Sequence, residues 1–135
     1  MKIDLRKPDL RTVEVGTVVI TTDGFEFELV SRVDKKESWK DLTSGITWHD
    51  KEDGSYTFDQ ALEKFGDRLP TKKEFETADK HGFRDVLPNM NHWFWSASVY
   101  AFNPGLAWAF NGALGTVNPS SRFSVRCALC RPLSV

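Results

Sequence analysis

The segment from Trp93 to Leu129 contains almost no charge, and this restricts the fold more than any other part of the chain. Only Arg122 and Arg126 are charged within it, although it holds three of the five tryptophans. From Trp95 to Val99 the residue types alternate with the period of two that is typical of a β-strand. The segment is also interrupted by Gly and Asn-Pro turn signals, which indicate several short strands rather than a helix.

The turn signals divide this segment into a small meander. Asn103–Gly105 predicts a first turn, Trp108–Phe110 a second short strand, and the pair Asn111–Gly112 a tight turn. Asn118–Ser121 reads as a further loop, and Phe123–Leu129 as the last strand. We therefore expect an antiparallel meander with long, uncharged loops that carry aromatic residues.

The first part of the chain predicts a β-hairpin. The β-branched segment 15–21 and the alternating segment 25–33 flank Thr22-Asp23-Gly24, which is typical of a hairpin turn. Residues 34–38 read as a charged turn. Four apolar residues then have the spacing to anchor a turn and a short strand to the core: Trp39, Leu42, Ile46 and Trp48.

Two capping boxes predict two helices in the middle of the chain. Thr57 and Thr71 each stand three residues before a Gln or Glu that can bond back to the cap. Gly66 and Gly82 supply the left-handed residue that commonly ends a helix. The first helix has one apolar face, made by Phe58, Ala61, Leu62 and Phe65. Strands, then helices, then strands again favour an α+β fold over a parallel sheet.

Length and charge limit the function. A chain of 135 residues suits one domain, for which we expect residues 13–135, preceded by an arm or linker over residues 1–12 that can serve assembly. The 18 basic and 19 acidic residues nearly balance, so nothing favours binding to nucleic acid or an anionic membrane. We expect no membrane insertion, because no apolar run approaches the length that spans a bilayer.

No cofactor or metal site is expected. Cys127 and Cys130 have the spacing of a redox or half-zinc motif, but no second ligand pair exists, and a buried Cys127 with a free or locally paired Cys130 is the simpler interpretation. The acidic loop 49–54 lacks the full ligand series of a calcium loop and reads as a solvated turn. The three histidines stand near no nucleophile pattern.

An ordered set of five motifs carries a family resemblance. The set comprises Gly45–Trp48, Arg68–Thr71, Phe94–Ser98, Ala107–Trp108 and Val125–Cys127. Over residues 40–129 it resembles the C-terminal domains of bacterial collagen-like adhesins, and it looks like the variable proteins of diversity-generating retroelements, including phage tropism determinants. Both families are similar to C-type lectins. The resemblance implies a single C-type lectin-like domain, with two helices packed on a small twisted antiparallel sheet with long loops.

The resemblance also implies a framework and a display surface. The framework positions are Trp95, Ser96, Ser98, Trp108, Val125, Arg126 and Cys127. The ligand-binding positions are Tyr100, Phe102, Asn103, Leu106, Asn111, Leu114, Asn118, Ser120, Ser121 and Phe123. Aromatic and small polar residues on loops suit adaptable recognition. We expect Trp95 and Trp108 to be core residues. The aromatic rings of the display set fit core packing or exposure equally well, and its Asn and Ser residues fit turns.

The expected function is non-enzymatic recognition of a cell-surface glycan or protein through residues 100–123. Such an adhesin or fibre-tip domain would act outside the cell, at its surface or on a phage particle, as part of a longer exported protein, and a homotrimer is one assembly that suits it. Calcium is not expected to take part, because no carboxylate follows Trp93. The first alternative is a structural or assembly module. The second, less favoured, is an enzyme related to formylglycine-generating enzymes, because Ser124–Ala128 resembles the closing motif of those enzymes.

Overall fold

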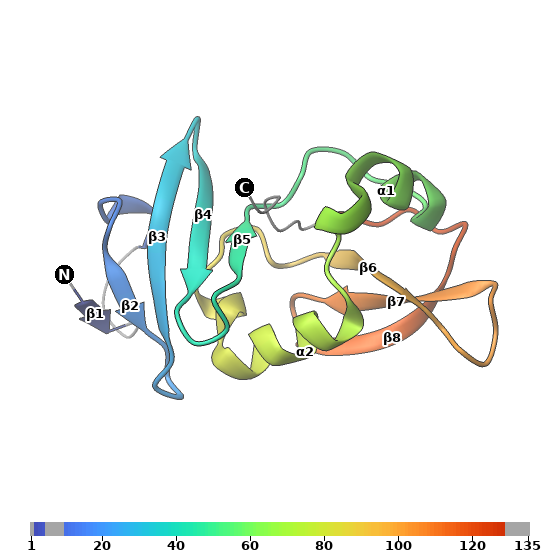
Figure 1. The fold of residues 1–135 in the computed structure, drawn as a ribbon. Coiled ribbons are helices and arrows are strands. Elements are labelled where there is room, and N and C mark those ends of the chain that lie inside the picture. Colours follow the sequence, from blue (N-terminus) through green and yellow to red (C-terminus); the bar gives the residue numbers. More distant parts are fainter. Residues whose placement is uncertain (1, 5–9, 129–135) are drawn as a thin grey trace.

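The computed structural model describes residues 2–4 and 10–128, and it shows an α+β protein, as the sequence predicts (Figure 1). The strands and helices are β1 (Lys2–Asp4), β2 (Val18–Ile20), β3 (Glu26–Val33), β4 (Lys36–Asp41), β5 (Thr47–His49), α1 (Phe58–Phe65), α2 (Lys72–His81), β6 (Trp93–Val99), β7 (Leu106–Asn111) and β8 (Thr116–Ser121). Short 3-10 turns are formed by Leu10–Thr12, Gly66–Arg68 and Phe83–Asp85.

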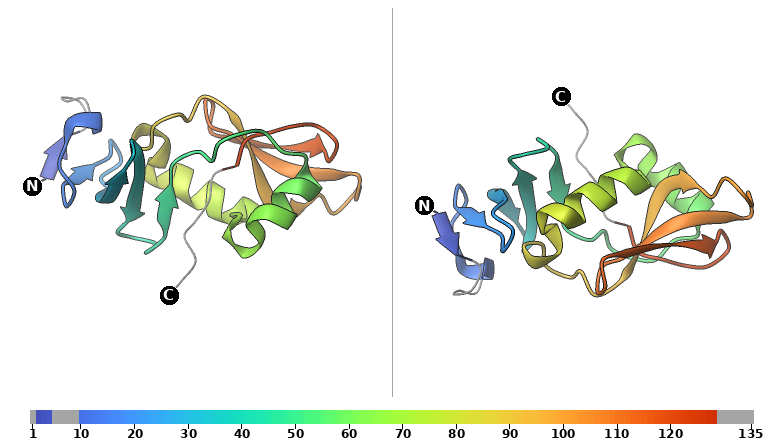
Figure 2. Two further views of the ribbon diagram at one scale, coloured as in Figure 1. Left: turned by 90° about the horizontal axis from the view of Figure 1, so that it is seen from above. Right: turned by 90° about the horizontal axis from the view of Figure 1, so that it is seen from below.

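The strands form two separate sheets. The first has the order β1-β2-β3-β4-β5, in which β1 runs parallel to β2 and the other neighbours are antiparallel. The second is the antiparallel meander β6-β7-β8. Figures 1 and 2 show the sheets at opposite ends of the molecule, with α2 between them and α1 against the second sheet. The expectation of one small sheet is therefore wrong.

Each face of the second sheet contributes side chains to a buried core, in keeping with the low charge of its sequence. Phe94 of β6 packs into a core with Trp39, Trp48 and Phe75, which joins the first sheet to α2. Its neighbour Trp95 points the other way, because side chains alternate along a strand, and it enters a second core beneath α1. One strand of aromatic residues thus supplies both cores.

Both predicted helices are present, with both capping boxes formed. Thr57 Oγ1 accepts a hydrogen bond from the Gln60 amide at 3.3 Å, and the Gln60 side chain accepts one from the Thr57 amide at 2.9 Å. The same reciprocal pair joins Thr71 and Glu74, at 3.2 and 2.9 Å. Gly82 ends α2 in the left-handed conformation, with φ of 90°. These bonds satisfy amides that a helix start would otherwise leave unpaired.

The predicted first hairpin is confirmed as β2 and β3, but the charged turn after it is shorter than expected. Only Asp34 and Lys35 turn the chain, with positive φ angles of 51° and 66°, as in a two-residue hairpin turn. Residues 36–38, expected in the turn, already belong to β4. Trp39 and Trp48 are fully buried as predicted, whereas Leu42 is exposed and does not anchor the core.

The meander differs from the prediction in its last strand. Residues 118–121, expected to form a loop, belong to β8, which pairs with β7 from Leu106 opposite Ser121 to Asn111 opposite Thr116. Pro119 is tolerated there because β8 is an edge strand. Among the described residues after Phe123, no strand forms, and only isolated bridges place Arg126 beside Tyr56 and Cys127 beside Phe94. Leu129, the end of that expected strand, lies outside the described residues.

Part of the segment expected to be an arm packs on the first sheet. Residues 2–4 form β1, and the buried side chains of Leu10 and Val13 belong to the first core. Arg32 Nη2 donates to the Leu10 carbonyl at 3.2 Å, and Arg32 Nη1 donates to the Val13 carbonyl. Residues 10–13 are thereby held against the first sheet.

Candidate ligand-binding site

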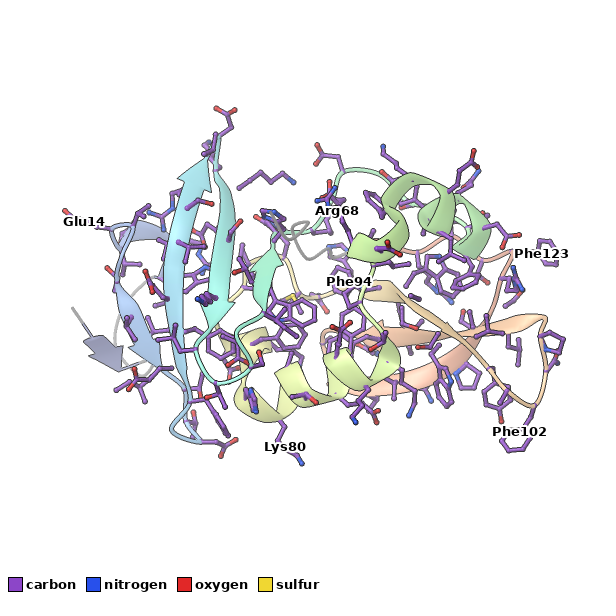
Figure 3. The ribbon with its side chains drawn as sticks, viewed as in Figure 1. Glu14, Arg68, Lys80, Phe94, Phe102 and Phe123 are labelled. Carbon is purple, nitrogen blue, oxygen red and sulfur yellow. The ribbon has the colours of Figure 1, made fainter. Side chains whose placement is uncertain are left out.

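Two loops meet at the end of the second sheet that lies farthest from the first sheet (Figure 1). One is the β6–β7 connection, residues 100–105, and the other follows β8 at residues 121–124. The Arg122 amide donates to the Gly105 carbonyl at 3.1 Å, so the loops touch. We call residues 100–106 and 121–123 the aromatic tip. Phe102 and Phe123 extend from this end into solvent, with 88% and 86% of their surfaces exposed (Figure 3).

Hydrogen bonds within the first loop hold Phe102 in place. The Tyr100 amide donates to the Leu106 carbonyl at 3.0 Å, and the Leu106 amide donates to the Asn103 carbonyl at 3.0 Å. Asn103 Oδ1 accepts a bond from the Gly105 amide at 2.9 Å, as is typical of an Asx turn. The loop is therefore a closed turn that presents its apolar ring outward. Asn103 serves that turn with its side-chain oxygen.

Arg122 joins the tip to the rest of the domain. Its guanidinium donates to the Pro104 carbonyl at 3.1 Å and pairs with Asp59 of α1. It also stands over the ring of Phe58, with its central carbon 5.0 Å from the ring centroid. Arg122 belongs to the loop after β8, and its side chain bonds both the β6–β7 loop and α1, which limits the movement of the two loops. The two exposed rings are consequently carried on a braced platform.

A row of aromatic rings runs from the tip along one face of the sheet. Phe102 contacts Tyr100 at 5.6 Å between ring centroids, and Tyr100 contacts Trp108 at 5.2 Å, both edge to face. Lys72 places its ammonium 4.6 Å from the Trp108 ring centroid. Trp108 is only half-buried, so the expectation of a core residue is wrong for it.

Two of the residues predicted for the binding surface lie at the other end of the sheet. Asn111 ends β7 and Leu114 lies in the turn that follows, where Asn111 Oδ1 accepts bonds from the Ala113 and Leu114 amides. Arg84, which follows α2, donates to the Ala113 carbonyl at 3.1 Å. The length of β7 separates this turn from the tip by about 17 Å. One ligand of modest size cannot contact both places.

The remaining predicted residues lie on β7 and β8 and divide between the two faces of the second sheet. Leu106 and Ser121 pair across β7 and β8 beside the aromatic row. Asn118 is exposed on the opposite face. Ser120, on that same face, is buried and accepts a bond from Arg126 Nη2 at 3.2 Å, so it does not contribute to a binding surface.

The described structure brings residues into the site that the sequence did not single out. Arg122 and Lys72 both contact the tip or its aromatic row, and Trp108 changes from a core residue to part of a partly open surface. The one sequence signal for Arg122 is that it is a charged residue in a segment that is otherwise almost uncharged. Nothing in the sequence places Lys72 over Trp108, because the contact depends on how α2 lies against the second sheet.

A serine–histidine pair lies away from the tip, on the first sheet. Ser38 Oγ and His49 Nδ1 form a hydrogen bond between opposed residues of β4 and β5. Burial lowers the pKa of His49, the positive charge of Arg68 lowers it further, and Glu52 opposes the shift. Ser38 is only 3% exposed, which prevents it from acting as a nucleophile on an external substrate.

The described residues contain no grouping of three or more His, Cys, Asp or Glu side chains that could hold a metal ion. Cys127 is free and half-buried rather than fully buried, and Cys130 lies outside the described residues. Asp50, expected in a solvated turn, is buried. Neither described helix is long and apolar enough to cross a bilayer.

Comparison of the chain with protein-family models, with curated proteins and with solved structures finds no match in any of the three.

Proposed function

We propose that this protein is a non-enzymatic recognition domain whose aromatic tip binds a glycan or protein on a cell surface. The exposure of Phe102 and Phe123 on braced loops is the observation that carries the proposal. Two phenyl rings that remain in water cost solvation free energy, and large exposed apolar groups mark interaction sites. Hydrogen bonds hold the backbone of the loops that carry these rings, which lowers the loop-ordering entropy lost on binding.

The family resemblance supports the same proposal. A C-type lectin-like fold would display ligand-binding residues at the end of a braced meander, and six of the ten expected positions lie at the tip: Tyr100, Phe102, Asn103, Leu106, Ser121 and Phe123. In this proposal binding needs no calcium, because no carboxylate follows Trp93 in the sequence. The domain would act at a cell surface or on a phage particle, as part of a longer exported protein.

The test is binding of the labelled domain to a glycan array and to bacterial envelope fractions, with and without a chelator. Phe102→Ala and Phe123→Ala should each weaken binding by about tenfold or more, the loss expected for a central aromatic contact. Leu114→Ala is the matched control, because Leu114 is also apolar and 70% exposed but lies at the opposite end of the sheet.

The two ligand classes give different results. Binding to array spots points to a glycan, whereas binding to envelope fractions that protease treatment removes points to a protein. Loss of binding in the chelator would contradict the calcium-independent site. Equal loss in Leu114→Ala and in the tip variants would refute the tip as the binding surface.

The alternative is a structural or assembly module of a larger surface protein, in which residues 1–12 are the expected assembly segment. Sedimentation velocity over a range of concentrations distinguishes the two functions. Loss of self-association without loss of ligand binding, on removal of residues 1–12, would favour a structural role for that segment. Ligand binding that depends on the tip, in a monomer or a trimer, would favour recognition.

A further inference from the structure

A pocket of about 410 Å³ opens at the first sheet, at the opposite end of the molecule from the aromatic tip. Its walls come from the β3–β4 turn, from β4, from the residue after β5, from the first 3-10 turn and from the segment before β6. Six polar side chains line it: Arg11, Arg32, Lys35, Glu37, Asp50 and Asn89. Pockets of this size hold small molecules.

Three of the five charges in this pocket form one ion-pair cluster, in which Arg11 and Arg32 both pair with Glu37. Glu37 is buried, and one of its oxygens accepts bonds from Arg32 Nε at 3.1 Å and Nη2 at 2.9 Å. The other oxygen accepts a bond from the Trp39 ring at 2.9 Å and lies 3.2 Å from Arg11 Nη2. Arg32 also bonds two backbone carbonyls. These groups hold residues 10–13 against the sheet and need no ligand.

The other two charges have no such partner. Asp50 is only 4% exposed. Its Oδ1 accepts bonds from the Lys51 amide at 2.7 Å and from Asn89 Nδ2 at 3.1 Å, which orients the carboxylate. Within the described part of the chain, no hydrogen bond or ion pair uses Asp50 Oδ2, and none uses the ammonium of Lys35. Asp50 Oδ2 is not among the described buried atoms that lack a partner, so this oxygen is accessible from the pocket that Asp50 lines.

We propose that this pocket binds a small zwitterion of the amino-acid type. The ammonium of the ligand would bond Asp50 Oδ2, and its carboxylate would bond the Lys35 ammonium. The two unpartnered protein charges are opposite in sign, so a ligand with one positive and one negative group compensates both, and an ion with a single charge compensates only one. The proposal concerns a different site from the aromatic tip and does not depend on recognition there.

The test is titration of the ¹⁵N-labelled protein with each of the common L-amino acids, followed through the side-chain amide resonances of Asn89. This amide bonds the same carboxylate as the proposed ligand. At least one amino acid should give a saturable shift. Butylamine and butyrate, which carry one charge each, should bind at least about tenfold more weakly, because truncating one partner of a buried charge pair weakens binding strongly.

Three variants complete the experiment. Asp50→Asn keeps the size of the side chain and an oxygen for the two donors, and Lys35→Gln changes an exposed turn residue. Each should weaken amino-acid binding by about tenfold or more. Lys80→Gln makes the same charge change on α2 (Figure 3) and should bind like the wild type.

The absence of a saturable shift with every amino acid would overturn the proposal. So would unchanged binding in Lys35→Gln, which is readable even if Asp50→Asn does not fold.

Discussion

Replacing Gly112 by alanine should strongly destabilise the domain, because this glycine lies where two backbone segments come very close. Its amide donates to the His92 carbonyl at 2.9 Å. A Cβ built at this position would stand 1.9 Å from the carbonyl oxygen of Met90 and 2.9 Å from an atom of the Phe94 ring. The first contact is with backbone, which cannot turn aside as a side chain would.

The magnitude follows from this geometry. A real Cβ essentially never approaches another atom within 3.0 Å, so relief of a 1.9 Å contact needs a backbone movement of more than 1 Å. Overpacking of this kind costs about 1–3 kcal/mol. The movement also strains the bond between Gly112 and His92, which contributes about 1 kcal/mol. We therefore expect the free energy of unfolding to fall by about 2–4 kcal/mol.

Thermal unfolding followed by circular dichroism measures this effect. For a domain of this size, a loss of about 3 kcal/mol lowers the melting temperature by roughly 10–15 °C. Gly105→Ala is the matched control, since its Cβ would meet only the side-chain oxygen of Asn103, at 3.2 Å. The control should change stability by less than about 1 kcal/mol. A Gly112→Ala protein that melts like the wild type would refute the close approach of the two backbones.

Three further perturbations test the burial and charge assignments. Trp95→Ala empties a fully buried site and should lower the free energy of unfolding by about 3–5 kcal/mol, whereas Trp108→Ala should lower it less, because its ring is half-buried; urea unfolding of both variants compares them. Phe102→Ala and Phe123→Ala should each change the unfolding free energy by less than about 0.5 kcal/mol, and a large fall in melting temperature would place that ring in the core. Burial lowers the pKa of His49 in the folded protein, so the unfolded chain binds the proton more tightly, and stability falls as the pH drops below about 6.5. Between about pH 7 and pH 5 the wild type should therefore lose more stability than His49→Gln, and equal losses in urea titrations at both pH values would contradict this.

Local signals predicted the helices well. The hydroxyls of Thr57 and Thr71 bond amides three residues away, and Gly82 ends α2 through its own backbone conformation. Each signal operates within one or two turns of helix, so the identity of a few neighbouring residues is sufficient to predict where the helix begins or ends. The first hairpin was predicted for the same reason, from a turn between a β-branched segment and an alternating one.

The third strand of the meander shows where local signals fail. Asn118 and Pro119 favour a turn by themselves, but pairing with β7 makes them part of β8. Phe123 and Val125 alternate with polar residues as a strand would, yet no neighbouring strand pairs with this segment among the described residues. A strand exists only when distant backbone groups are available to bond it, and a single sequence does not reveal that partner.

The candidate sites depend still more on distant contacts. The sequence indicated that the loops around Phe102 and Phe123 are aromatic, but it left their exposure open. The tertiary structure decided it: Phe102 and Phe123 project into solvent at the end of the second sheet, whereas Trp95 is buried beneath α1. The pocket at the first sheet has no sequence signal at all, since Lys35 and Asp50 come together only through the folding of that sheet.

The sequence by itself determined the α+β class, the two capped helices and the aromatic character of the last third of the chain. These properties arise from side chains acting on nearby backbone and from composition. Only the tertiary structure decided that the strands form two sheets, that Asn111 and Leu114 lie far from the tip, and that Asp50 is buried. Each of these depends on contacts between residues distant in sequence, where the burial of apolar surface outweighs local preference.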